Sequence, residues 1–197
     1  MANKDAAFGL RPLKTVGQQD DSTGMSSYNI SPGDASVIFQ GSLVGSPATG
    51  TGYVDLQTAG LVLNLGAFWG TFYNDPTTLK PTFKNYYPGS VTPPNGGAVE
   101  AFVYDSPSQM YEIQSDNTGA SAQADIFKCA DLAGVSGSTL NGVSSMELGD
   151  ATLGTTGQFK IIGVSRDPEN NDIGSANVNW RVMLNESLLG SGTAGAA

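Results

Sequence analysis

The sequence predicts an all-β protein: an antiparallel β-sandwich or a partly closed β-barrel with an extended N-terminal arm. Three observations favour this fold class. The 197 residues include 26 Gly and 10 Pro but only 14% charged residues, which is typical of short strands joined by many turns. The apolar stretches have the length of strands, and several alternate with a period of two. A chain of this length is expected to build one well-buried core, which we place in residues 26–189.

Residues 1–25 form the predicted arm, because no period of 2 or 3.6 is sustained there and the stretch runs into the polar sequence GQQDDSTGMSS. Fully extended, the arm would reach at most about 80 Å. Its first fourteen residues hold Lys4, Arg11 and Lys14 against one acid, Asp5, whereas the whole chain is acidic. This contrast favours a segment that leaves its own body to contact an acidic surface. Solvated lysines on a loose terminus are the alternative.

The first half of the body is predicted to contain four strands. Gly66 and Gly70 interrupt the longest, an aromatic stretch, where they would allow a bend or a bulge. The turn sequence NDPTTLK joins that stretch to the next one, so the two are predicted to form a hairpin. The strands lie within 27–31, 35–45, 52–75 and 81–89.

The second half is predicted to contain strands within 99–105, 109–115, 158–167 and 176–189, so that about eight to ten strands are expected in all. Alternation assigns an inward face to Val99, Ala101, Val103, Tyr111, Ile113, Val178, Trp180, Val182 and Leu184. The opposite, outward face receives Glu100, Phe102, Tyr104, Glu112 and Gln114. Between these strands, 121–132 is the one segment predicted as a short helix, although it is short enough to be a loop, and 134–157 is predicted as a polar stretch. Residues 190–197 are predicted as a flexible tail.

The sequence lacks the residues that most catalytic sites need. There is no histidine, which excludes Ser-His-Asp and Cys-His mechanisms and most zinc sites. Neither a nucleophile elbow nor a phosphate-binding glycine loop is present. Glu100 and Glu112 lie on successive predicted strands and could face each other as an acid–base pair, but solvated strand faces produce such pairs routinely. We therefore expect no enzymatic activity, no cofactor and no metal.

Two weaker binding patterns remain. The loop 166–174 offers oxygen ligands of the kind calcium prefers, yet it departs from the EF-hand pattern, and an acidic hairpin turn explains it equally well. Trp69, Tyr73, Tyr86 and Tyr87 could stack on sugars, although such aromatics in all-β proteins more often belong to a core or a subunit contact.

Charge and hydropathy exclude several classes of partner. The net charge of −9 and the pI near 4.2 argue against a nucleic-acid surface. No apolar run approaches the roughly 20 residues needed to span a bilayer, and no signal peptide is expected. The single cysteine, Cys129, has apolar neighbours and is predicted to be a small buried side chain, which is compatible with assembly in a reducing compartment.

Several segments together resemble the capsid decoration (cement) proteins of tailed bacteriophages. They are MANKDAAFGLRPL, IFQGSLV, GAFWGTFYNDPTTLKPTFKNYYP, VEAFVYDSPSQMYEIQSDN and GQFKIIGVSRDPENNDIGSANVNWRVMLNESLL. The resemblance covers most of residues 1–189 and contains no catalytic signature.

The resemblance implies a β-rich virion protein that assembles in the host cytoplasm, clusters as trimers on the outer capsid surface and braces the shell. Its partner would be the major capsid protein. Phe8, Leu10 and Leu13 would be anchors buried in a neighbour, Arg11 would pair with a neighbour's carboxylates, and Pro12 would keep the arm extended. A tail-tube or head–tail connector component, or a carbohydrate-binding module, are the alternative functions.

Overall fold

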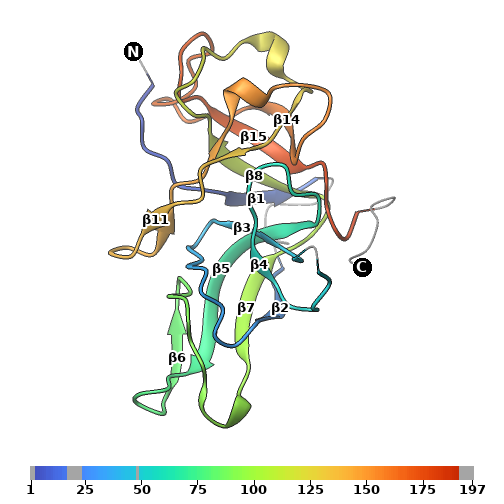
Figure 1. The fold of residues 1–197 in the computed structure, drawn as a ribbon. Helices are drawn as coiled ribbons and strands as arrows, with labels where there is room; N and C mark the ends of the chain where they lie inside the picture. The colour runs from blue at the N-terminus through green and yellow to red at the C-terminus, as the bar shows by residue number, and fades with distance from the viewer. Residues whose placement is uncertain (1–2, 17–23, 48, 191–197) are drawn as a thin grey trace.

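The structure, a computed structural model, describes residues 3–16, 24–47 and 49–190 and is all-β. Two antiparallel sheets, one above the other in Figure 1, pack as a sandwich. In the described ranges no helical element exceeds three residues; the three short 3-10 helices are η1 (Pro94–Gly96), η2 (Gln123–Asp125) and η3 (Asp150–Thr152). The predicted all-β class and antiparallel sandwich are therefore confirmed. The predicted tail from residue 191 onward and most of the polar run after the arm lie outside the described residues.

The upper sheet has five strands in the order β1-β8-β15-β14-β9. Its central ladder pairs β8 with β15 and places Trp180 opposite Ile113 and Val182 opposite Tyr111. All four side chains are buried, as the alternation predicts. The five strands are β1 (Arg11–Thr15), β8 (Gln109–Gln114), β15 (Asn179–Leu184), β14 (Phe159–Val164) and β9 (Cys129–Ala130).

The lower sheet is built around the long strand β5, which pairs with β7 and also with β3 near its start and β6 near its end. The β5–β6 pairing confirms the predicted hairpin. The strands, in the order β2-β7-β5-β3-β4 with β6 beside β5, are β2 (Ser26–Ile30), β7 (Val99–Tyr104), β5 (Asn64–Asn74), β3 (Leu43–Gly45), β4 (Asp55–Leu56) and β6 (Pro81–Lys84).

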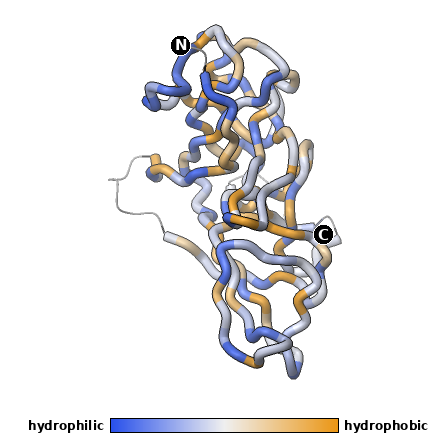
Figure 2. The backbone as a smooth tube through the Cα atoms, turned by 90° about the vertical axis from the view of Figure 1, so that its left-hand side faces the viewer, coloured by the Kyte–Doolittle hydropathy of each residue, from blue (hydrophilic) through white to orange (hydrophobic). Residues whose placement is uncertain are grey.

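Two apolar cores share the strand β5. Ala67 belongs to the upper core, with Trp180 and Phe159, whereas Phe68 belongs to the lower core, with Val103. The two sheets are further joined because the Tyr111 hydroxyl on β8 donates a hydrogen bond to the Tyr104 carbonyl on β7, at 2.7 Å. Hydrophobic and hydrophilic stretches alternate along the backbone in both halves (Figure 2), as expected when strands bury one face.

The segment between the strands β8 and β14 differs from the expectation. Of the two alternatives for 121–132, the helix is wrong: the segment contains η2, β9 and the first residue of the next short strand, and Phe127 adopts a positive φ of 75° that breaks any helix. The polar stretch 134–157 contributes Met146 and Leu148, both fully buried, to the upper core. Its short strands form two hairpins, β10 (Leu132–Ala133) with β13 (Glu147–Leu148) and β11 (Gly137–Ser138) with β12 (Val143–Ser144).

The outward assignment of Glu112 and Gln114 is also wrong, since both are buried. The N-terminal segment covers them. Gln114 donates a hydrogen bond to the Lys4 carbonyl at 2.9 Å and accepts one from the Ala6 amide at 2.8 Å. The alternation correctly placed these two residues on the face of the sheet opposite the core. It did not predict that the N-terminal segment lies over this face.

One carboxyl gives the fold a pH dependence. Burial, and then the nearby Asp116, raise the pKa of Asp150 to about 7. In the unfolded chain this carboxyl ionises near pH 4, so its stabilising contribution is complete below pH 4 and is lost as the pH rises to 7. We expect Asp150→Asn to increase the free energy of unfolding at pH 8 by about 1–2 kcal/mol, a value reduced because the side chain is partly exposed. Urea unfolding at pH 4.5 and 8 measures the difference.

The matched control is Asp75→Asn, because the amides of Thr78 and Thr77 bond the exposed Asp75 carboxylate and lower its pKa. This control should gain no stability at pH 8. If Asp150→Asn increased the free energy of unfolding equally at pH 4.5 and pH 8, the raised pKa of Asp150 would be contradicted.

Candidate adhesion site

The N-terminal segment, residues 3–16, lies on the body of its own chain. Its strand β1 extends the upper sheet by pairing with β8, where Arg11 lies opposite Glu112 and Pro12 opposite Tyr111. Figure 1 shows the segment descending along the upper sheet and then crossing the level at which the two sheets meet. The expectation of an arm that leaves the body does not hold for these residues.

Leu10 fixes the segment at this crossing. Its side chain is 2% exposed and belongs to the upper core, and its amide donates to the Gly41 carbonyl at 2.7 Å. Gly9 allows the close approach: its φ is +72°, and an added Cβ would lie 2.6 Å from the Gly41 oxygen. The predicted anchor is therefore buried, but in its own chain.

Arg11 is likewise paired within the chain. Its guanidinium lies 3.0 Å from a carboxylate oxygen of the buried Glu112 and 4.1 Å from the centre of the Phe8 ring. The second oxygen of Glu112 accepts a hydrogen bond from the Ser165 hydroxyl. Both oxygens of this carboxylate are thus occupied by partners from the same chain.

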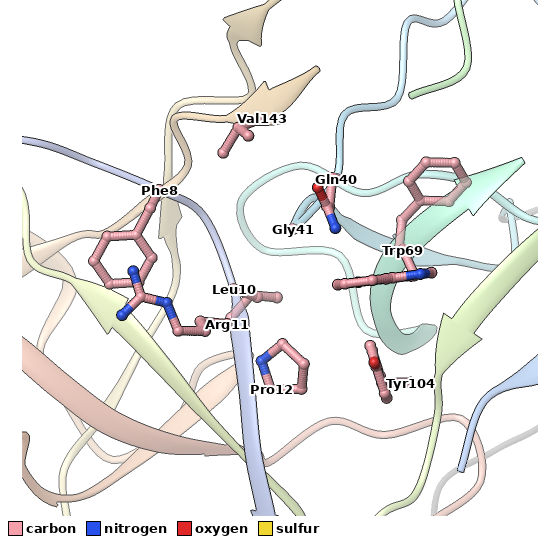
Figure 3. A pocket seen from close by; sticks show the side chains of 10 residues that line it. Phe8, Leu10, Arg11, Pro12, Gln40, Gly41, Trp69, Tyr104 and Val143 are labelled. Carbon is pink, nitrogen blue, oxygen red and sulfur yellow. The ribbon is translucent and has the colours of Figure 1, made fainter. Parts of the chain in front are cut away.

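A pocket of about 220 Å³ opens between the N-terminal segment and the lower sheet. In Figure 3, Leu10 and Pro12 extend from the segment toward Trp69 and Tyr104, and the Arg11 guanidinium lies against Phe8. The lining residues are Phe8, Leu10, Arg11, Pro12, Gln40, Gly41, Phe68, Trp69, Tyr104 and Val143. The pocket therefore joins the predicted anchor residues to an aromatic strand of the body.

Next to this pocket the lower sheet presents aromatic side chains to solvent. Trp69, Phe72 and Phe83 are 37%, 39% and 54% exposed. They are linked to half-buried rings: Trp69 packs edge-on against Tyr104, with ring centres 5.8 Å apart, and Phe83 lies 6.2 Å from Phe102. We call Trp69, Phe72, Phe83, Phe102 and Tyr104 the aromatic surface.

The topology explains why the aromatic surface is uncovered. Phe72 lies opposite Phe83 on β6 and opposite Glu100 on β7, on the face of the sheet away from the lower core. The upper sheet covers this face only near Ala67 and Tyr104, where the upper core begins. Aromatic side chains exposed together on one face of a sheet make this face the candidate interaction surface of the body.

Comparisons with protein-family models, with curated proteins and with solved structures yield no match. The site is therefore interpreted from its own geometry. In the described ranges no helix is long and apolar enough to cross a membrane.

The other predicted anchors have mixed positions. Phe8 and Pro12 are half-buried beside the pocket, and Leu13 is half-buried on the outer face of the upper sheet. The structure brings Phe8, Leu10, Arg11 and Pro12 together and leaves Leu13 apart. Binding of a partner by these five residues stays a prediction.

The four aromatics considered for sugar stacking do not form one platform. Tyr73 and Tyr87 are buried in the lower core, at 2% and 0% exposure. Tyr86 stacks on Phe39 at 6.0 Å, so only Trp69 reaches the aromatic surface. The sequence pattern identified the aromatic strands but not which rings face solvent.

The two carboxylate patterns of the sequence lie in separate places in the structure. Glu100 and Glu112 lie in different sheets, on β7 and β8, and neither is the cross-strand partner of the other. In the loop 166–174, Asp167 accepts a hydrogen bond from Glu169 and another from Asn179. Within the part of the chain that the structure describes, no group of three or more His, Cys, Asp or Glu residues is placed to hold a metal.

Sequence reasoning missed the role of Phe72, Phe83 and Phe102. A signal was present, because alternation assigned Phe102 to the outward face, opposite Val99, Ala101 and Val103. A large apolar residue on the face assigned to solvent indicates that something else covers that face. The missing information was the extent of the upper sheet, which residue patterns do not report.

Proposed function

We propose that this protein is a non-enzymatic component of a tailed-bacteriophage virion that binds the outer capsid surface and stabilises the shell by bridging neighbouring capsomers. The observation that carries the proposal is the aromatic surface, with Trp69, Phe72 and Phe83 exposed on a rigid sheet. The sequence resemblance to capsid decoration proteins supports the choice of partner, the major capsid protein.

The aromatic surface has the chemistry of a protein interface. Burying one large apolar side chain contributes about 1.5–3 kcal/mol, and aromatic residues are enriched among the side chains that dominate binding energy. A sheet holds these rings in place before binding, so little conformational entropy is lost on association. Repetition of one contact on a symmetric shell multiplies its effect.

The position of the N-terminal segment supports a rigid adhesive body rather than a tethered one. Leu10 and Arg11 hold the segment beside the pocket, so Phe8 and Pro12 extend the apolar area of the aromatic surface. We propose that a capsid segment contacts this combined area. A trimer, as the resemblance implies, would present three such areas.

The test uses particles that lack the protein and purified variants added back. The double variant Phe72→Ser with Phe83→Ser should raise the dissociation constant for particles at least 100-fold, because two aromatic contacts of about 1.5–3 kcal/mol each are lost. Co-sedimentation with the particles measures binding, and circular dichroism confirms that the variant is folded.

The matched control is Val62→Ser, which alters a side chain as exposed as Phe83, at 54%, outside the aromatic surface. It should bind within twofold of the parent. Equal binding of the double variant and the parent would contradict the proposal. If labelled protein were found on the tail of the particle instead of the head, a tail-tube or connector component would be favoured.

A further inference from the structure

A second groove lies on the outer face of the upper sheet, away from the aromatic surface. Leu13, Lys14, Met110 and Arg181 line it, and its volume is about 340 Å³. The β1–β8 pairing is irregular between Pro12 and Thr15, which places Leu13 and Lys14 beside Met110. The groove therefore combines two apolar walls with two cationic side chains.

Arg181 has no acid of its own in this groove. Its cross-strand neighbour Glu112 already binds Arg11 and the Ser165 hydroxyl through its two oxygens. Among the described residues only two ion pairs form, Arg11–Glu112 and Lys128–Asp125, and neither includes Arg181. The Arg181 Nε is one of eight buried side-chain nitrogen or oxygen atoms among the described residues that have no hydrogen-bond partner within the protein.

Gly163 sets the position of this guanidinium. It lies opposite Arg181 on β14, and a Cβ added there would lie 2.8 Å from the Arg181 Nη2. Because Gly163 has no side chain, the Arg181 guanidinium can lie directly against the backbone of β14. A planar donor held in place is suited to two parallel hydrogen bonds with a carboxylate.

The charge around the groove contrasts with that of the chain. The strands β1, β8 and β15 carry three cations, Arg11, Lys14 and Arg181, and one acid, Glu112, a charge of +2, whereas the chain carries −9. Such a patch attracts an anionic surface.

We infer that this groove binds a carboxylate side chain, Asp or Glu, of an acidic segment on the protein partner. Arg181 is the main ligand, Lys14 is a second cation, and Leu13 and Met110 pack against the aliphatic part of the bound side chain. The inference rests on the proposed function for the identity of the partner and adds the chemistry of the partner's surface. The apolar walls and the acidic chain favour a carboxylate over the phosphates of a nucleic acid.

The test titrates the full-length chain with a capped peptide of eight glutamates at low salt. The Arg181 Nη–H resonances should shift on binding, together with the backbone amides of Leu13 and Lys14. Arg181→Gln should weaken the peptide at least tenfold and Lys14→Gln about threefold. Lys80→Gln, on the exposed turn after β5, is the matched control and should bind within twofold.

Undiminished peptide binding by Arg181→Gln would overturn the inference. Tighter binding of an eight-nucleotide thymidine strand, or of inorganic phosphate, at the same resonances would also overturn it, because the site would then select phosphate. The peptide assay contains no particles, so it separates the two proposals. Peptide binding without particle binding would refute the capsid function alone, and particle binding that is insensitive to Arg181→Gln would refute the groove alone.

Discussion

Leu10→Ala is expected to lower the free energy of unfolding by about 3 kcal/mol, the typical cost of removing a buried leucine side chain from a packed core. Leu10 is 2% exposed and packs in the upper core with Tyr111 and Trp180. Loss of its side chain should also release β1 from β8. Urea unfolding measures the first effect, and hydrogen exchange of the β8 amides measures the second.

The matched control for Leu10→Ala is Val16→Ala, one residue past the end of β1, where the side chain is 47% exposed. This control should change stability by less than about 0.5 kcal/mol. If Leu10→Ala were as stable as the parent, the N-terminal segment would not belong to the core of its own chain, and an arm that binds a neighbour would again be the better description.

Gly66→Ala is expected to destabilise the protein by about 3 kcal/mol or more, because the new methyl group has no space. A Cβ at Gly66 would lie 1.9 Å from the Tyr104 carbonyl oxygen, so β5 and β7 would have to separate. These two strands form the centre of the lower sheet and carry Phe72 and Phe102. We expect a lower melting temperature and a loss of particle binding in the same variant.

Gly119→Ala is the matched glycine control, since the nearest atom to its added Cβ would be 3.8 Å away, an ordinary contact. It should melt within a few degrees of the parent. A Gly66→Ala variant with an unchanged melting temperature would show that β5 and β7 are not in close contact at this point.

The upper and lower strands were predictable where one face of a strand is buried and the pattern has period two. Trp180, Val182, Val99 and Val103 follow this rule, and all are fully buried. The short strands between residues 129 and 148 were not predictable, because two-residue ladders leave no period. Met146, between two of these strands, is buried against residues of the upper sheet that are distant in the sequence.

The candidate site was only partly predictable for a related reason. The sequence predicted Phe8, Leu10 and Arg11 as binding residues, because large apolar and basic side chains occur there in a segment without a regular period. It did not reveal that Leu10 has its place in the chain's own core or that Glu112 pairs with Arg11. Both contacts join residues about one hundred positions apart, and only tertiary structure brings them together.

An electron cryo-microscopy map of the complete particle tests the central claim most directly. We predict that Phe72 and Phe83 are covered by a neighbouring capsid molecule, while residues 3–16 remain on the body of their own chain. A map in which the aromatic surface faces solvent on every copy would contradict the account.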